Sequence, residues 1–405
     1  MKSSGSLGSQ TLGGSCPTTC TSEEGISKVS RCRTRLCAAA LKLKPNHPQA
    51  LCNAALVLWS QNELDLAEEA LRKAIELGAN LKARVNLGLL LLTRGRYAEG
   101  FKEYAWRFAA YNLPMRGPAE LPIWTGRTPV NGTLYVWPEQ GLGDEIMYAA
   151  NMGVASARAR KVIWECDPRL VDLMQRGAPE NVTFVPKKGP PPLTIDMAAQ
   201  IPIGCVGQLT RPSGEPYLKA DPERIAKFKE AVPKDKRIVG ISWHSANVKF
   251  GHKKSLTLAD FSAFTENSDY HCVSLQYGEH EHGTLWRMYG LDMTNDIDGL
   301  AALIKACDLV VTVSNTTAHL AGALGVPCIV LVSDAGGKLW YWGMGDKTPW
   351  YNSVRIERFG RGLPAVGEDE EQDNEPADYE GVVFQEIDPP RRQLKPQSTR
   401  FRPNT

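Results

Sequence analysis

Short apolar segments alternate with amphipathic ones from residue 133 to residue 332, and this alternation limits the possible folds more than any other feature. Strands are predicted at residues 133–138, 161–166, 182–186, 237–243, 271–276, 309–314 and 327–332. Helices are predicted at residues 145–158, 168–176, 222–231, 258–264, 298–306 and 316–325, and residues 187–219 are predicted to be irregular. Apolar strands joined by crossover helices are typical of parallel sheets. We therefore expect an α/β fold with two Rossmann-like domains, at residues 132–221 and 222–362, which bind ligands beyond the carboxyl ends of their strands.

An internal repeat precedes these strands. Five positions recur 33 residues later, as the pairs Asn53 and Asn86, Ala55 and Gly88, Asn62 and Gly95, Leu64 and Tyr97, and Ala67 and Gly100. Apolar residues in each unit recur at helical spacing, and small residues let paired helices approach closely. The repeat predicts an all-α segment at residues 31–113, of the kind that stacks and binds partners on a concave face. A Pro- and Gly-rich linker follows at residues 114–131, and we expect it to pack on the next domain through Trp124.

Composition excludes several classes of protein. The 405 residues include 47 Lys and Arg and 45 Asp and Glu, a balance that argues against a dedicated nucleic-acid binder. No apolar run approaches the roughly 18 residues of a membrane span, and the N-terminus lacks the apolar core of a signal peptide. We therefore expect a cytoplasmic protein with no membrane span. Residues 1–30 are expected to form a flexible lead and residues 363–405 a disordered tail.

Ten cysteines are too few, in a chain of this length, for a dense disulfide framework. Four of them, Cys16, Cys20, Cys32 and Cys37, lie close together, but no CxxC pair is present. We therefore expect reduced thiols, with a zinc site as the alternative.

The histidines between residues 244 and 282 have no carboxylate partner in the sequence that would fix a metal, so no metal is expected there either.

The segment WPEQGLGDEIMYA, residues 137–149, joins the first predicted strand to a helix. Gly141 and Gly143 permit a tight turn, and Asp144 falls at the helix start, at the carboxyl end of the strand. The segment is no P-loop, because Gly-Lys-Ser/Thr does not follow. Asp144 is a candidate general base, and capping of the helix is an equally good account of an Asp at this position.

A second candidate element is VTVSNTTAHLAGALGVP, residues 311–327. A strand ends here and a helix begins, so that hydroxyls and free backbone N–H groups converge at Ser314, Asn315, Thr316 and Thr317. A helix N-terminus favours anions, phosphates in particular. His319 lies one turn into the helix and is a candidate contact to a phosphate or to the acceptor. The alternative for His319 is a hydrogen-bonded histidine of the core.

A third segment, GISWHSANVKFGHKKSLTL at residues 240–258, supplies the substrate-binding candidates Trp243, His244, Lys253 and Lys254. Cations beside a bound diphosphate would stabilise a leaving group, whereas a solvated basic loop is the alternative. Gln276 ends the following strand in VSLQYGEHEH. Its amide is suited to reading the edge of a base, and an amide that caps a loop is the alternative.

These motifs are similar to those of a known family. EQGLGDEI, SLQYG and SNTTAHLAGALG, behind repeats that end in GRYAEGFKEYAWRF, resemble tetratricopeptide-repeat proteins with a glycosyltransferase family 9-like domain. Such proteins are relatives of the ADP-heptose:lipopolysaccharide heptosyltransferases, and the resemblance runs from about residue 36 to residue 360. It implies a GT-B fold, a nucleotide-sugar donor held mostly by the C-terminal domain, and inverting transfer without a metal or other cofactor.

The resemblance also implies roles for particular residues. Asp144 corresponds to the proposed base on the acceptor hydroxyl, and Gly141 and Gly143 to its turn. The phosphate-binding turn and its histidine correspond to Asn315, Thr316 and His319. Lys253 or Lys254 falls near the lysine that binds the donor phosphate, with the register open between them. Ser314 stands where heptosyltransferases have an Asp that contributes to donor binding, so another sugar, on UDP or GDP, is an alternative to ADP-heptose.

From these observations we expect a glycosyltransferase that moves a sugar from a nucleotide sugar to a hydroxyl of a glycan or protein recruited by the repeats. Two alternatives remain. One is a non-catalytic tetratricopeptide scaffold with a degenerate nucleotide-sugar-binding domain, which the Ser314 departure favours. The other is a sugar-nucleotide epimerase of the same fold.

Overall fold

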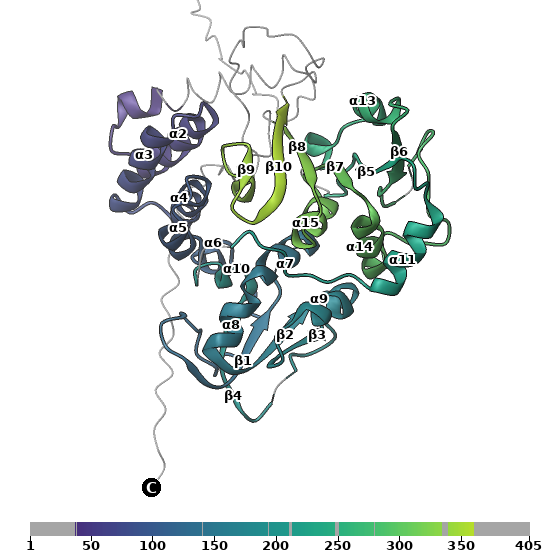
Figure 1. The fold of residues 1–405 in the computed structure, drawn as a ribbon. Helices are drawn as coiled ribbons and strands as arrows, with labels where there is room; N and C mark the ends of the chain where they lie inside the picture. The colour runs from purple at the N-terminus through teal and green to yellow at the C-terminus, as the bar shows by residue number, and fades with distance from the viewer. Residues whose placement is uncertain are drawn as a thin grey trace, which may run out of the picture.

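The computed structural model describes residues 37–359 apart from 38, 140, 193, 210–212, 248–250, 279 and 334–338. The predicted flexible lead, the predicted tail from residue 363, and Cys16, Cys20 and Cys32 lie outside the described residues. Within the described residues the chain forms a helical segment followed by two sheets built mainly of parallel strands (Figure 1). The fold is therefore mixed α/β, as the sequence predicts.

The helical segment repeats in structure as it does in sequence. Its helices are α2 (Pro48–Ser60), α3 (Leu64–Glu76), α4 (Leu81–Thr93), α5 (Tyr97–Tyr104) and α6 (Arg107–Tyr111). α2 packs on α3 and α4 on α5, and the second pair begins 33 residues after the first. Asn62 and Gly95, equivalent in the repeat, both have positive φ in the turn between paired helices, where Asn and Gly are favoured. The helical hairpins are thus present, and their assignment to the tetratricopeptide class stays a prediction.

The first sheet has the strand order β3-β2-β1-β4, and every neighbouring pair is parallel. Its strands are β1 (Val130–Trp137), β2 (Ala159–Cys166), β3 (Val182–Pro186) and β4 (Met197–Pro202). The helices of this half are α7 (Leu142–Tyr148), η1 (Ala149–Asn151), α8 (Met152–Arg158), η2 (Pro168–Leu170), α9 (Val171–Gly177) and α10 (Ile203–Val206). β1 lies inside the sheet, so the loop that follows it opens near the middle of the carboxyl edge.

The second sheet has the order β6-β5-β7-β8-β10-β9, parallel except for the β9 edge. Its strands are β5 (Arg237–Ser242), β6 (Tyr270–Ser274), β7 (Leu309–Val313), β8 (Cys328–Ser333), β9 (Lys347–Thr348) and β10 (Tyr351–Phe359). The helices of this half are α11 (Pro222–Ala231), α12 (Gly251–Lys254), η3 (Leu258–Phe261), α13 (Ser262–Thr265), α14 (Ile297–Ala306), α15 (Thr316–Ala323) and η4 (Trp340–Trp342). β5 and β7 are central neighbours, so the loops after them meet.

Several predicted elements were wrong. Residues 187–219, predicted irregular, contain β4 and α10, because the short edge strand MAAQIP has few branched residues and was not recognised. The predicted helix 145–158 is interrupted by η1, and β1 begins at Val130, inside the predicted linker. β9 and β10 were missed, although Val354 and Ile356 of β10 alternate with charged residues as a half-buried strand requires. Trp124 is buried in the core, as expected.

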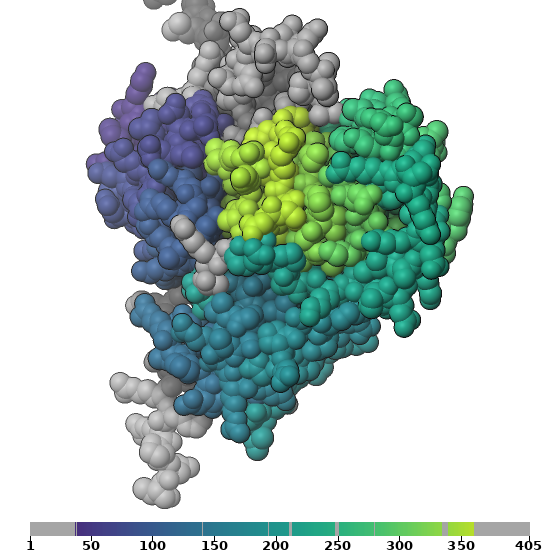
Figure 2. Space-filling model, in the orientation of Figure 1, coloured from purple at the N-terminus to yellow at the C-terminus, as the bar shows by residue number. Residues whose placement is uncertain are grey.

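The helical segment contacts both halves of the α/β part. The ring of Phe101 in α5 lies 6.3 Å from that of Tyr148 in α7 and 5.5 Å from that of Trp340 in η4. Figures 1 and 2 show the purple segment lying against the yellow-green β10 region and the blue first half. The two halves are also joined directly, because Arg176 of α9 forms an ion pair at 2.9 Å with Asp298 of α14. In the described part of the chain, no helix combines the length and apolarity needed to cross a bilayer.

Candidate active site

The loop after β1 presents Asp144 at the carboxyl edge of the first sheet. Gly141 is the N-cap of α7, and Asp144 Oδ2 accepts a hydrogen bond at 3.2 Å from the Gly141 backbone N–H. Asp144 therefore caps its helix, as one of the two interpretations of the sequence states. Its side chain is half-buried, and burial raises the pKa of this carboxyl to about 6, against the opposing effects of Gly141 and Lys254. A carboxylate with this pKa is suited to general-base chemistry near neutral pH, so the two interpretations are compatible.

The turn after β7 carries Asn315 and the N-terminus of α15. Asn315 Oδ1 accepts hydrogen bonds from Ala318 N at 3.3 Å and from Thr312 Oγ1 at 3.1 Å. Its Nδ2 donates to Ser242 Oγ at 2.9 Å and to the His244 carbonyl at 3.2 Å. Asn315 thus joins the carboxyl ends of β5 and β7 and is fully engaged by the protein.

The hydroxyls of this turn differ in their surroundings. Ser314 Oγ is buried and accepts a hydrogen bond from Trp342 Nε1 at 2.8 Å, and it is also hydrogen-bonded to Tyr341. Thr317 Oγ1 is buried and has no hydrogen-bond partner within the described part of the chain. Thr316, the first residue of α15, is half-buried. The first N–H groups of a helix lack partners inside the helix, so Thr316 is where a ligand anion can reach them.

His319 lies between the two halves of the fold. Its ring is 4% exposed, stacks on Trp342 at 5.0 Å between centroids, and has Nδ1 3.0 Å from Tyr351 Oη. A Cβ at Gly143 would lie only 2.9 Å from His319 Cδ2, so Gly143 is the residue that lets α7 approach the ring. Burial, assisted by the charge of Lys254, lowers the pKa of His319 to about 3. The imidazole is therefore neutral at physiological pH.

The loop after β5 carries Lys253 and Lys254, and their burial shows which of the two lies beside Asp144 and His319. Lys254 is buried and interacts electrostatically with both Asp144 and His319. Burial lowers the pKa of Lys254, and Asp144 opposes that change. Lys253, its neighbour in α12, is half-buried. The structure therefore brings together Asp144, Lys254 and His319, each from a different loop or helix.

The remaining predicted residues frame this cluster. Gln276 is buried, and its Oε1 accepts hydrogen bonds from Ser242 Oγ, Trp243 N and His244 N at 2.9–3.0 Å. Its Nε2 donates to the Tyr277 carbonyl at 2.9 Å. The oxygen is thus occupied by the protein, which favours the loop-capping interpretation over the reading of a base.

Trp243 and His244 belong to a small aromatic group beside the strand ends. The Trp243 ring is buried and contacts those of His280 and His282 at 6.2 Å and 5.7 Å. His244 is half-buried, its ring centroid lies 4.6 Å from that of His280, and its Nδ1 is without a partner among the described residues. Within the same residues, no group of three or more His, Cys, Asp or Glu is arranged to hold a metal ion.

Sequence reasoning missed several residues that shape the site. Tyr351 Oη contacts His319 Nδ1, and Trp342 Nε1 donates a hydrogen bond to Ser314 Oγ. Glu139, at the start of the loop that carries Asp144, accepts a hydrogen bond from the Gly204 backbone N–H. The aromatic clusters WYW at 340–342 and WY at 350–351 were a signal, because buried Trp N–H and Tyr O–H groups usually find hydrogen-bond partners.

Comparison with known proteins gives distant similarities. No family model matches the chain. Protein FlbA of Caulobacter vibrioides is 27% identical over 371 residues, covering 81% of this chain and 61% of FlbA. The chain thus spans about three fifths of the length of this curated relative.

Among solved structures, a glycosyl transferase family 9 protein from Veillonella parvula aligns with TM-score 0.42 and 14% identity over 58% of this chain and 88% of that one. The ADP-heptose LPS heptosyltransferase II of E. coli aligns with TM-score 0.41 and 14% identity over 57% of this chain and 91% of that one.

Proposed function

We propose that the chain is a glycosyltransferase that moves a sugar from a nucleoside-diphosphate sugar to a hydroxyl acceptor, with inversion and without a metal. One observation carries the proposal. A carboxylate with a raised pKa, Asp144, meets a buried cation, Lys254, and the open N-terminus of α15 at the facing carboxyl ends of two sheets. Ligands of open parallel sheets bind at such ends, and the three groups match the charges that develop in sugar transfer.

The proposed reaction uses each group once. The acceptor oxygen forms a bond to the anomeric carbon while its proton passes to the Asp144 carboxylate. The bond from that carbon to the diphosphate oxygen breaks on the opposite face, and the diphosphate leaves with the electron pair. Lys254 and the N–H groups at Thr316 stabilise the negative charge that accumulates on the leaving group.

The proposal includes several nucleotide sugars as donor. In the resemblance described above, an Asp of the heptosyltransferases is replaced by Ser314, whose hydroxyl is engaged by Trp342 and Tyr341. A sugar other than heptose, carried on ADP, UDP or GDP, therefore belongs to the proposal. The helical segment is proposed to recruit the glycan or protein acceptor.

The test begins with binding. Thermal unfolding of the full chain is measured with ADP, UDP, GDP and CMP, and ligand at about 100 times its Kd adds roughly 2.7 kcal/mol to stability. The matching nucleotide sugars are then assayed for release of the nucleoside diphosphate. We expect one nucleotide series to stabilise the wild type and Lys254→Met to lose that effect. Stabilisation by none of the nucleotides would overturn the proposal.

A specific observation also favours a second candidate, a scaffold that binds a nucleotide sugar without transferring it. Ser314, Asn315 and Gln276 are all engaged by internal hydrogen bonds and leave few polar groups for a donor. A scaffold would bind the nucleotide with equal strength in the wild type and in Asp144→Asn and would release no nucleoside diphosphate from the sugar. A transferase would bind in both and release it only in the wild type.

A further inference from the structure

Four buried aromatic rings from three parts of the chain meet in one group. They are Phe101 of α5 in the helical segment, Tyr148 of α7 in the first half, and Trp340 and Trp350 of the second half. The centroid of the Phe101 ring lies 5.5 Å from that of Trp340 and 6.3 Å from that of Tyr148, edge to face in both pairs. Tyr148 and Trp340 also contact Trp350, at 5.9 Å and 5.8 Å. The helical segment and both halves thus each contribute to this aromatic cluster.

The Phe101 ring is closely confined. A Cβ at Gly207, the residue that ends α10, would overlap the tip of the ring, so the ring rests on the backbone of the first half. The helix behind the ring is confined as well, because a Cβ at Gly88 of α4 would lie 2.5 Å from the Tyr104 backbone N of α5. The position of the ring is therefore fixed by the packing of the helical segment.

Trp340 connects the cluster to the turn after β7. Trp340 and Trp342 are the first and last residues of η4, a single 3-10 turn, so a shift of one is expected to move the other. Trp342 Nε1 donates to Ser314 Oγ at 2.8 Å, and the Trp342 ring stacks on that of His319 at 5.0 Å. Ser314 precedes the N-terminus of α15 and His319 follows it. Trp342 thus holds both sides of residues 314–317, which we call the donor turn.

The same cluster touches the helix that carries the candidate base. Tyr148 lies four residues after Asp144 in α7, so the two side chains project from the same face of that helix. Phe101 contacts Tyr148 and Trp340 together, and it therefore packs between α7 and η4. The spacing of these two elements depends on the ring between them.

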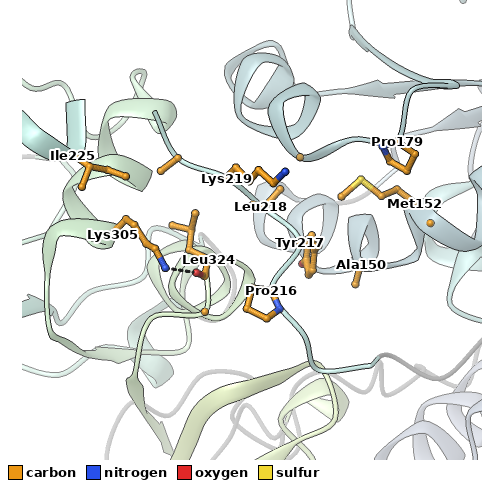
Figure 3. A pocket seen from close by; sticks show the side chains of 14 residues that line it. Ala150, Met152, Pro179, Pro216, Tyr217, Leu218, Lys219, Ile225, Lys305 and Leu324 are labelled. Atoms are coloured by element: carbon orange, nitrogen blue, oxygen red, sulfur yellow. Dashed lines mark hydrogen bonds between the residues drawn. The ribbon is translucent and has the colours of Figure 1, made fainter. Parts of the chain in front are cut away.

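Packing between the two halves is not continuous elsewhere. A cavity of about 650 Å³ opens between them, with Met152 and Pro179 of the first half on one side and Lys305 and Leu324 of the second half on the other (Figure 3). The cavity removes contacts that would otherwise fix the halves relative to each other. The contacts that do bridge the halves, the aromatic cluster among them, therefore have more influence on where η4 lies.

We propose that Phe101 is a positioning residue, which seats Trp340 and thereby holds Trp342 on the donor turn. The seating of η4 is a property of the chain alone, and its effect on a bound donor rests on the proposed function. In that function the helical segment contributes to donor binding through Trp340 and Trp342, in addition to recruiting the acceptor.

The first measurement reads the Trp342 hydrogen bond directly and needs no ligand. The full chain is labelled with ¹⁵N-tryptophan, and the Trp342 indole N–H is assigned by the signal lost in Trp342→Phe. Phe101→Leu keeps an apolar side chain but removes the ring edge that meets Trp340. We expect the Trp342 signal to move in this variant and its proton to exchange with solvent about tenfold faster, because opening of the bond becomes easier.

Phe184→Leu is the matched control. Phe184 is 3% exposed and packs on Trp164 at 5.7 Å, so the same substitution is made at an equally buried Phe–Trp pair outside the cluster. It should leave the Trp342 signal unchanged. An unchanged Trp342 signal in folded Phe101→Leu, or equal movement in both variants, would overturn the proposal. If circular dichroism shows that Phe101→Leu does not fold, Trp340→Phe alters the same contact from the other side and carries the same expectation.

The second measurement tests the effect on the ligand. Titration calorimetry is performed with the nucleotide that stabilises the wild type in the thermal screen. We expect binding to Phe101→Leu to be about tenfold weaker, equivalent to about 1.4 kcal/mol, and binding to Phe184→Leu to be as in the wild type. Wild-type affinity in a Phe101→Leu protein whose Trp342 signal has moved would overturn the positioning role. A wild type that binds none of the nucleotides overturns the transferase proposal instead, whereas the Trp342 signal still decides the seating of η4.

Discussion

Arg107, at the start of the last helix of the helical segment, forms a buried ion pair with Glu139, two residues beyond β1. Arg107 Nε donates to Glu139 Oε2 at 2.8 Å, and the Gly204 backbone N–H donates to Glu139 Oε1 at 3.0 Å. Both side chains are less than a tenth exposed. The loop that presents Asp144 is thus fastened at its beginning by a residue of the helical segment. The segment is a structural component of the candidate active site in addition to any role in recruitment.

Replacement of Arg107 by Met should destabilise the fold and loosen this loop. Removal of one partner from a buried ion pair leaves an uncompensated charge and costs about 3–5 kcal/mol. We expect urea unfolding of Arg107→Met to show a loss in this range. The double variant Arg107→Met with Glu139→Gln removes both charges, keeps an acceptor for Gly204, and should recover most of the loss.

The matched control is Arg355→Met, because Arg355 pairs with Glu357 on the surface and is 63% exposed. Exposed pairs contribute about 1 kcal/mol or less, so this variant should unfold near the wild-type midpoint. Equal losses in Arg107→Met and Arg355→Met would contradict the role given to the buried pair.

Asp144 should control the acid side of the pH profile. Its pKa is raised by burial to about 6, so the carboxylate required as a base is lost as pH falls through 6. We expect transfer to decline below about pH 6 and Asp144→Asn to lose about 10²–10⁴-fold in rate, the usual contribution of a general base. The measurement is release of nucleoside diphosphate from the bound sugar nucleotide between pH 5 and 8, values spanning that pKa.

The same shift has a consequence for stability. A carboxyl whose pKa is higher in the folded state than its ordinary value of 3.8 binds its proton more tightly when folded. Its contribution to stability therefore decreases as pH rises from about 4 to about 6. Asp144→Asn should remove this contribution, and an unchanged slope of unfolding free energy over that window would contradict the raised pKa.

The sequence predicted those parts of the fold that depend on local pattern. Strands such as β7 are continuous apolar runs, and α7 and α15 begin within a few residues of the ends of β1 and β7, so both candidate loops were found. The edge strand β4, which pairs with β1, escaped because MAAQIP has a single β-branched residue, Ile201, unlike the apolar runs of the buried strands.

The candidate site was predictable only in part, for a similar reason. Adjacent Lys253 and Lys254 are equivalent in sequence, and only the geometry of α12 decides that Lys254 is buried beside Asp144. Tyr351 reaches His319 from a distant part of the chain, and no local spacing joins these two residues. Contacts of this kind follow from tertiary packing, which periodicity does not describe.

Gly143 should be required for the approach of the two halves at the site. A Cβ at this position would lie 2.9 Å from His319 Cδ2, so Gly143→Ala forces the buried ring or the turn to shift. We expect a reduced rate of transfer and a changed His319 signal in ¹H–¹⁵N correlation spectra of the protein labelled with ¹⁵N-histidine. Gly153→Ala is the control, because a Cβ there meets no atom within 4 Å and Ala favours the helix by about 0.5–1 kcal/mol. Equal effects of the two substitutions would contradict the close contact.

Lys254 should act on both the ligand and the ionisation of Asp144. Its charge lowers the pKa of Asp144, so Lys254→Met should move the acid limb of the activity profile to higher pH. Loss of the cation should also weaken binding of the nucleoside diphosphate, measured by titration calorimetry against the nucleotide found in the stability screen. Lys253→Met is the control, since Lys253 is the neighbouring lysine and is half-buried where Lys254 is buried, and it should keep the wild-type limb. The acid limb of the activity profile could instead move to lower pH in Lys254→Met, or move equally in both variants. Either result would show that Lys254 does not face the carboxylate.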